Sequence, residues 1–168
     1  EGVFSKNIEM QEPTLYSLAL GNEYIIICPT IGEQISIKAS GSNFSGTYNI
    51  EGSLESELLK ELNKENYNVR LSLKSMSEEL SKADTAKLDS IRTSIIEKYT
   101  STKQYQEKIT SDFINKNLGS LTTLIALYRT FDGFALFDYN QSLEMHKKVL
   151  QGLKQTLPNN QHTLTLEN

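Results

Sequence analysis

The chain has 168 residues, of which 38% are hydrophobic and 23% are charged, and its net charge is −4. This length suits one folded domain, or a small domain with an appended helical part, and the composition lies outside the disordered class. The 17 basic residues are scattered among 21 acidic ones without a dense cluster, which argues against nucleic-acid binding. No apolar run is longer than that of Tyr24–Cys28, which is far shorter than the roughly 20 residues that span a bilayer. We therefore expect a soluble folded domain.

The start of the chain carries no recognisable targeting signal. Residues 1–4 lack an initiator Met, a basic region and an apolar region, so we expect any signal or membrane anchor to lie outside this chain. The only cysteine, Cys28, excludes an internal disulfide and a CxxC redox centre. With only two histidines besides, ligands for a structural metal are few. We predict no cofactor and no bound metal.

Residues 1–52 show the two-residue alternation of antiparallel strands. Ile35 and Ile37 alternate with polar residues, and Tyr16, Leu18 and Leu20 occupy alternate positions further upstream. The dipeptide Gly21-Asn22 tolerates positive φ and predicts a tight hairpin. The pattern predicts about five short strands over residues 3–51, and the glycine-rich segment 41–46 is interpreted as a hairpin loop rather than a phosphate-binding loop.

Residues 53–158 show a helical period instead. Ser53 is placed as an N-cap before a stripe of leucines, and Ser120 is placed similarly before a later stripe. A stripe from Leu88 to Phe113 shifts in phase near residues 100–102, which is compatible with one long helix or two. Residues 131–134 are interpreted as a loop, and residues 159–168 as an extended tail leading toward a further domain. The predicted fold class is α+β, an antiparallel sheet portion followed by a mainly helical portion.

Few side chains are candidates for chemistry, and each has a simpler explanation. His146 lies beside the apolar stripe of the last helix and His162 lies in the tail, so a packing or solvated role is favoured over a shared metal or acid/base role. Glu78 and Glu79 are adjacent on a helix and point about 100° apart, which favours a solvated face over a catalytic pair. Cys28 is interpreted as a small buried hydrophobe. We predict no catalytic residue.

The aromatic residues Phe131, Phe134, Phe137 and Tyr139 allow two interpretations. They are either an exposed recognition patch or the closure of a helical core, and the core is favoured because loop aromatics usually pack inward.

The order of several short segments gives a family resemblance. The segments that carry it are Gly2–Phe4, Pro13–Leu18, Gly32–Ile37, Tyr48–Ser53, Ser120–Leu121 with Ala126–Leu127, and Leu157–Asn160. In this order they resemble the non-catalytic N-terminal region that precedes the thioredoxin domain in bacterial cell-envelope thiol-disulfide oxidoreductases. The chain departs from that family at Ile31, where a proline is common before Gly-Glu, and in lacking the family's first strands.

The resemblance implies an exported protein of the periplasm or cell envelope, in many relatives anchored by a lipid, with a thioredoxin-like domain downstream. We therefore expect an accessory domain that positions, dimerises or supplies client contacts for a reductase, without catalysis of its own. The alternative is a stand-alone envelope module that binds peptide or glycan through the aromatic loop or an exposed strand edge. A small hydrolase with an unrecognised site is a third hypothesis.

Overall fold

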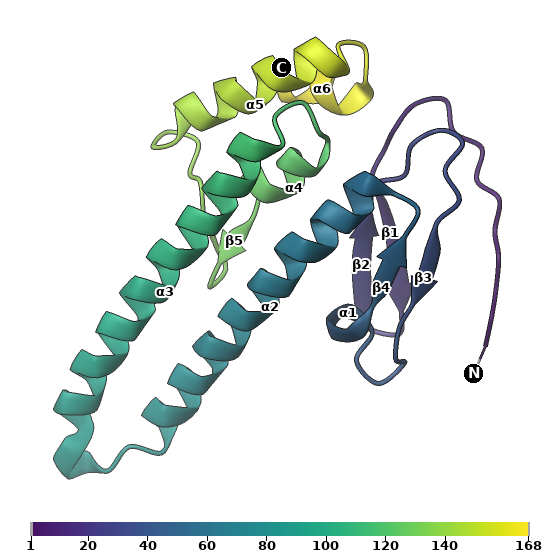
Figure 1. Ribbon diagram of the computed structural model, residues 1–168. Helices are drawn as coiled ribbons and strands as arrows, with labels where there is room; N and C mark the ends of the chain where they lie inside the picture. Colours follow the sequence, from purple (N-terminus) through teal and green to yellow (C-terminus); the bar gives the residue numbers. More distant parts are fainter. Residues whose placement is uncertain (1, 168) are drawn as a thin grey trace.

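The computed structural model describes residues 2–167, without the side chain of Ala86, and it has an α+β fold. The elements are β1 (Tyr16–Leu20), β2 (Glu23–Ile27), β3 (Ser36–Lys38), α1 (Phe44–Thr47), β4 (Asn49–Glu51), α2 (Leu54–Ser81), the 3-10 turn η1 (Thr85–Lys87), α3 (Leu88–Lys116), α4 (Thr122–Leu127), β5 (Thr130–Phe131), β6 (Phe134–Ala135), α5 (Leu143–Thr156) and α6 (Gln161–Glu167). A small β layer lies beside one end of a long helical hairpin, and α4, α5 and α6 cap that end (Figure 1).

The β layer consists of two separate antiparallel ribbons, β1 with β2 and β3 with β4. The predicted turn at Gly21-Asn22 is confirmed, because Leu20 pairs with Glu23 and Gly21 has φ +61°. The expected run of about five strands is not found, since residues 2–52 of the described chain contain four. Residues 2–11 have no regular secondary structure and make no backbone ladder, and an unpaired segment is not a strand.

The connection between β3 and β4 holds a short helix, where we expected only a hairpin loop. In α1 the Asn43 side chain accepts a hydrogen bond from the Gly46 N–H at 3.1 Å, which caps the turn. Phe44 is buried in a small core with Ile25, Tyr48 and Ile50. Burial of Phe44 explains why the segment forms a helical turn against the β layer and does not extend into solvent as a simple loop.

Two serines join the β layer to the start of α2. The Ser53 hydroxyl accepts from the Ser56 N–H at 3.4 Å, as predicted for an N-cap, and donates to the Cys28 carbonyl at 3.2 Å. The Ser56 hydroxyl accepts from the Cys28 N–H at 2.9 Å. Just before them, Gly52 has φ +91°, and a Cβ there would lie 2.1 Å from the Gln34 carbonyl oxygen. This joint requires glycine and fixes the direction of α2 relative to β2 and β4.

The long helices α2 and α3 form an antiparallel hairpin and are about 42 and about 44 Å long at roughly 1.5 Å per residue. The ambiguity near residues 100–102 is resolved, because α3 is one continuous helix. There the hydroxyls of Thr100 and Thr102 donate to the carbonyls of Ile96 and Lys98, at 2.8 and 2.7 Å. These local bonds satisfy the polar side chains and leave the helix intact. No helix in the described part of the chain is long and apolar enough to cross a membrane.

The main core lies where the base of the hairpin meets the other helices. Its fully buried members include Leu59, Ile114, Leu127, Val149 and Leu153, contributed by α2, α3, α4 and α5. Cys28 joins this core from the β layer. The helices therefore form their own core and also pack, through the start of α2, on β2 and β4.

The predicted extended tail is wrong over Gln161–Glu167, which form α6. Asn160 accepts from the His162 N–H at 3.0 Å, Thr163 is fully buried, and Leu166 packs against the main core. The alternation of Leu164 and Leu166 suggested a strand, but contact with the main core beside α5 favours a helix that partly buries Leu166.

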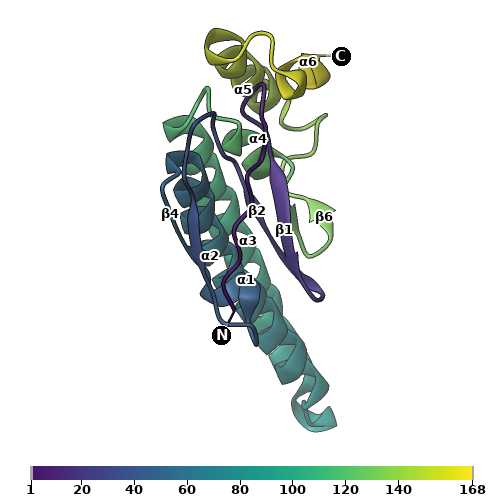
Figure 2. The same ribbon diagram turned by 90° about the vertical axis from the view of Figure 1, so that its right-hand side faces the viewer.

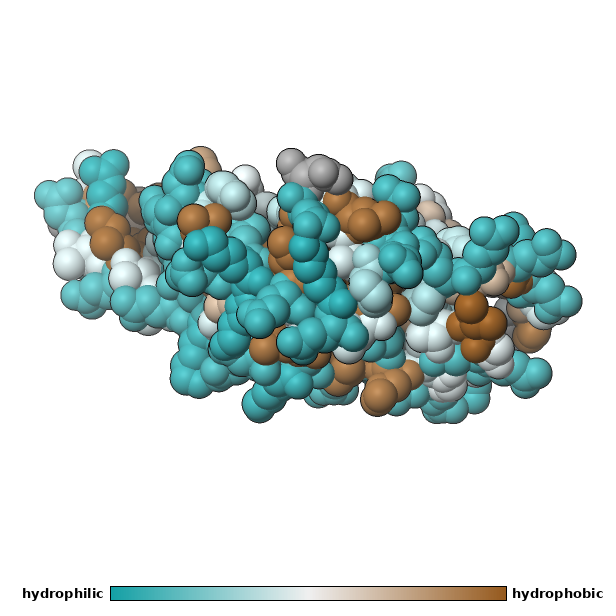
Figure 3. Space-filling view, turned by 90° about the horizontal axis from the view of Figure 1, so that it is seen from above, coloured by the Kyte–Doolittle hydropathy of each residue, from teal (hydrophilic) through white to brown (hydrophobic). Residues whose placement is uncertain are grey.

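Residues near the two ends of the chain are joined to each other. The Asn160 side chain donates to the Pro13 carbonyl at 2.7 Å, and the Thr14 hydroxyl lies 2.9 Å from His162 Nε2. Seen from above, this end of the molecule is largely hydrophilic, with apolar side chains in small separate groups (Figure 3).

Candidate functional site

The two histidines have separate structural roles. The buried ring of His146 is flanked by Tyr139 and Tyr128, with centroids 5.1 and 6.2 Å away, and its Nδ1 lies 3.1 Å from the Ser142 carbonyl. His162 lies on a different helix, α6, and its Nε2 is 2.9 Å from the hydroxyl of Thr14 in the irregular N-terminal segment. No group of three or more His, Cys, Asp or Glu side chains in the described chain is arranged to hold a metal ion.

The acidic pair Glu78 and Glu79 lies on a solvated helix surface. Glu78 is 3.9 Å from Lys74 and 4.0 Å from Lys82, and Glu79 is 2.7 Å from Lys98 on α3. All these side chains are substantially exposed. The two carboxylates face different lysines, so they do not form an acid/base pair.

Cys28 is an inert thiol. It is 1% exposed in the main core, and burial, with smaller contributions from Glu55 and Glu33, raises its pKa to about 12. The nucleophilic form of cysteine is the thiolate, which is scarce at neutral pH when the pKa is that high. Cys28 is therefore a packing residue, as the sequence suggested.

The aromatic segment divides between core and surface. Phe131 is buried with Val69 and Leu136, and its ring meets Tyr99 edge-to-face at 5.0 Å. Phe134 is 75% exposed, and Tyr139 is 61% exposed. The expected loop at 131–134 is a two-stranded hairpin, because Asp132 and Gly133 both have positive φ. The Asp-Gly dipeptide between two aromatics was the sequence signal for this turn.

A groove of about 530 Å³ lies between α3 and the segment from β6 to the start of α5. Its lining residues are Lys103, Gln104, Glu107, Lys108, Ser111, Ala135, Leu136, Phe137, Asp138, Gln141 and Ser142. Two parts of the chain far apart in sequence thus form the two walls. The aromatic segment contributes Phe137 to the groove, while Phe131 beside it belongs to the core.

The charges of the groove are largely neutralised by their neighbours. Lys103 lies 3.5 Å from Glu107, and Lys108 lies 2.6 Å from Asp112. The hydrogen bond from Lys108, more than its charge alone, lowers the pKa of Asp112. The side chains of Gln104 and Gln141 have no hydrogen-bond partner among the described residues. The groove therefore offers neutral amide groups and carries no concentrated charge.

The wall formed by residues 138–142 is held by local hydrogen bonds. The Asp138 carbonyl accepts from Gln141 N–H at 3.1 Å and from Ser142 N–H at 2.8 Å, and its carboxylate accepts from Asn140 N–H at 3.0 Å. Such a turn is ordered before any ligand arrives, which reduces the entropy cost of binding.

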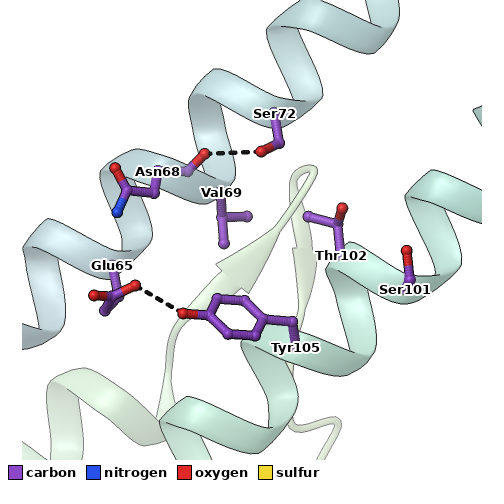
Figure 4. A pocket seen from close by; sticks show the side chains of 7 residues that line it. All are labelled: Glu65, Asn68, Val69, Ser72, Ser101, Thr102 and Tyr105. Carbon is purple, nitrogen blue, oxygen red and sulfur yellow. Dashed lines mark hydrogen bonds between the residues drawn. The ribbon is translucent and has the colours of Figure 1, made fainter.

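A second, smaller crevice of about 310 Å³ lies between α2 and α3 (Figure 4). Tyr105 donates to Glu65 at 2.8 Å across it, and Val69 forms part of its lining. Ser72 and Thr102 donate to backbone carbonyls of their own helices, at 3.1 and 2.7 Å. Because it is smaller and most of its polar side chains already have hydrogen-bond partners, this crevice is a weaker candidate than the groove.

Arg129 is the charged group that sequence reasoning missed. It is 7% exposed, its Nη2 donates to Asn63 at 3.1 Å, and its Nε and Nη1 have no partner among the described residues. Burial, helped by the charge of Arg70, lowers its pKa to about 10. Gln106 nearby donates to Asn66 at 2.7 Å. No pattern in the sequence marks an arginine that becomes buried after α4.

Comparisons of this chain with protein-family models, with curated proteins and with solved structures gave no match.

Proposed function

We propose that this chain is a non-catalytic accessory domain of a bacterial cell-envelope thiol-disulfide oxidoreductase. In this role it positions, dimerises or supplies client contacts for a thioredoxin-like domain downstream in the same protein. The envelope location, and attachment to the membrane only through an anchor outside this chain, belong to the same proposal. It rests on the order of segments from Gly2–Phe4 to Leu157–Asn160 in the sequence.

The observation that carries the non-catalytic part is the state of Cys28. Its backbone is bonded on both sides by Ser53 and Ser56, its side chain is closed off from solvent, and its thiol pKa is about 12. Thiol exchange needs an accessible thiolate. Any disulfide chemistry of the whole protein therefore has to come from cysteines outside this chain.

An insulin-reduction assay on the chain alone tests this part. We expect no turnover with dithiothreitol as electron donor, and the same result for Cys28→Ser. Turnover that disappears in the Cys28→Ser variant would contradict the proposal.

The gene sequence beyond the codon of residue 168 tests the redox part separately. A CxxC within a thioredoxin pattern is the expected finding. A stop codon at that point would remove the redox assignment and leave an isolated domain.

The groove favours a second candidate, a stand-alone module that binds a peptide or a glycan. Its support is that the predicted aromatic segment supplies one wall through Phe137, next to the ordered turn at residues 138–142. Calorimetry with neutral hexasaccharides and with carboxymethylated insulin B chain tests it. Binding lost in Gln141→Ala and kept in Ser72→Ala, which alters the other crevice, would support this candidate. Equal losses of binding in the two variants, or no binding by the original chain, would contradict this candidate.

A further inference from the structure

The outer edge of β1 is the least protected edge in the β layer. β2 is the only element of the described chain against which β1 packs extensively, whereas β2 also contacts α1 and α2. β1 contains no charged residue and no proline, while the short strand β3 ends at Lys38. Charged residues, prolines and short length are the features that normally prevent an edge from pairing with another strand.

The register of the hairpin shows which backbone groups of β1 face outward. A two-residue loop closes on a hydrogen-bonded pair, here Leu20 with Glu23, and hydrogen-bonded pairs then alternate along the ribbon. The N–H and C=O groups of Leu20, Leu18 and Tyr16 are therefore directed to β2. Those of Ser17 and Ala19 are directed to the open edge, and both residues are exposed.

No segment of the described chain satisfies this edge. Residues 2–11 run past the side of the β layer that lies away from α2, without a backbone hydrogen bond to β1 (Figures 1 and 2). Val3 and Phe4 in that segment are 101% and 78% exposed. A two-stranded ribbon of this kind gains stability when a further strand is added.

From this edge we infer that β1 pairs with β1 of a second copy, in antiparallel orientation about a two-fold axis at Leu18. This deepens the proposed function, in which dimerisation is one role of the domain. The arrangement is self-complementary. The outward N–H and C=O groups of Ser17 in each copy meet those of Ala19 in the other copy. Both side chains are small and uncharged, so nothing obstructs the pair.

The pairing also fits the faces of the ribbon. Leu18 is half-buried and packs with Ile25 on the inner core of the β layer, so two Leu18 side chains meeting at the axis extend that core across the dimer. The ribbons join into one continuous four-stranded sheet.

Light scattering coupled to gel filtration of the whole chain tests the inference. We expect twice the mass of the chain, dissociating on dilution. Ala19→Pro removes the outward N–H, and a proline on an edge leaves the β1–β2 bonds in place, so we expect a monomer. Ala19→Thr is the matched control, because it keeps the N–H and should remain a dimer. Circular dichroism checks that both variants are folded.

A charge exchange tests the register independently of proline. Ser17→Lys with Ala19→Lys places like charges opposite each other in both symmetric pairs, and should raise the dimer dissociation constant at least about tenfold. Ser17→Lys with Ala19→Glu places opposite charges there and should restore the dimer. Equal dissociation constants for the two double variants would overturn the pairing.

One further result would also overturn the pairing, namely a monomer for the unmodified chain. If such a monomer dimerises once residues 2–11 are deleted, its own N-terminal segment is what covers the edge. This result leaves the proposed accessory role intact, since that role is tested by the insulin assay and by the downstream gene sequence.

Discussion

The base and the free end of the α2–α3 hairpin have the same helical backbone but different surroundings. At the base, Leu59 and Ile114 are fully buried among four helices and the β layer. At the free end the two helices extend past every other element (Figure 2), and Ile96 is 65% exposed. What holds the free end is the contact between the two helices, supported by exposed ion pairs such as Lys98 with Glu79. The comparison shows that the same helical structure is stabilised by burial among several elements at one end and by the packing of two helices alone at the other.

The largest expected effect comes from removing a side chain at the base. Leu59→Ala should lower the free energy of unfolding by about 2–5 kcal/mol, because it leaves a cavity in a closely packed core. Ile96→Ala at the free end is the matched control and should stay within about 0.5 kcal/mol. Urea denaturation measures both. Similar losses at the two sites would show that the free end is covered in solution.

The next effect concerns the buried arginine between these regions. Arg129→Met should raise the free energy of unfolding at pH 7 by about 1–3 kcal/mol, because it replaces an unpaired buried charge with an apolar side chain. The folded-state pKa is lowered to about 10 from an ordinary value of 12.5. Arg129 therefore has its full destabilising effect below about pH 10. The effect declines as the pH rises further, because the guanidinium loses its proton at a lower pH in the folded state than in the unfolded state.

Urea denaturation of Arg129→Met and of the original chain at pH 7 and pH 10.5 measures the size and the sign of the change in the free energy of unfolding. The increase in the variant should be smaller at the higher pH. A loss of stability in the variant would show that the guanidinium is satisfied by bound water or an ion.

A smaller effect is expected at the start of α2. Ser53→Ala removes the N-cap and the bond to the Cys28 carbonyl, and should lower the free energy of unfolding by about 1 kcal/mol. Ser77→Ala, on an exposed part of the same helix, is the control and should change the free energy of unfolding by about a few tenths of a kcal/mol. Thermal unfolding followed by circular dichroism would detect the difference, and equal melting temperatures would count against a role for Ser53 in the joint.

The smallest effect belongs to the ion pair at the free end. Lys98→Gln should lower the free energy of unfolding by less than about 1 kcal/mol, since both partners are partly exposed. The difference between the variant and the original chain should shrink in high salt, because salt screens exposed charges. A larger effect that persists in high salt would indicate that the free end is more rigid than its exposure suggests.

Local patterns in the sequence determined much of the element order. The Gly21-Asn22 turn, the change to helix at Ser53 and the α+β class follow from residue spacing, turn chemistry and capping, which act over a few residues. The buried, packing role of Cys28 also followed from its position after an isoleucine-rich strand. The proposed redox role, by contrast, rests on the sequence resemblance.

Tertiary contacts decided the rest. The segment at Phe44 is helical because Phe44 is buried, and Gln161–Glu167 form a helix because Leu166 reaches the main core. Residues 2–11 are not a strand because no other described segment pairs with them. The groove required α3 and residues 135–142, which are distant in sequence, to meet. The burial of Arg129 is likewise invisible to a periodic pattern. A sequence pattern reports which faces are apolar, but only the folded chain decides which of those faces find a partner.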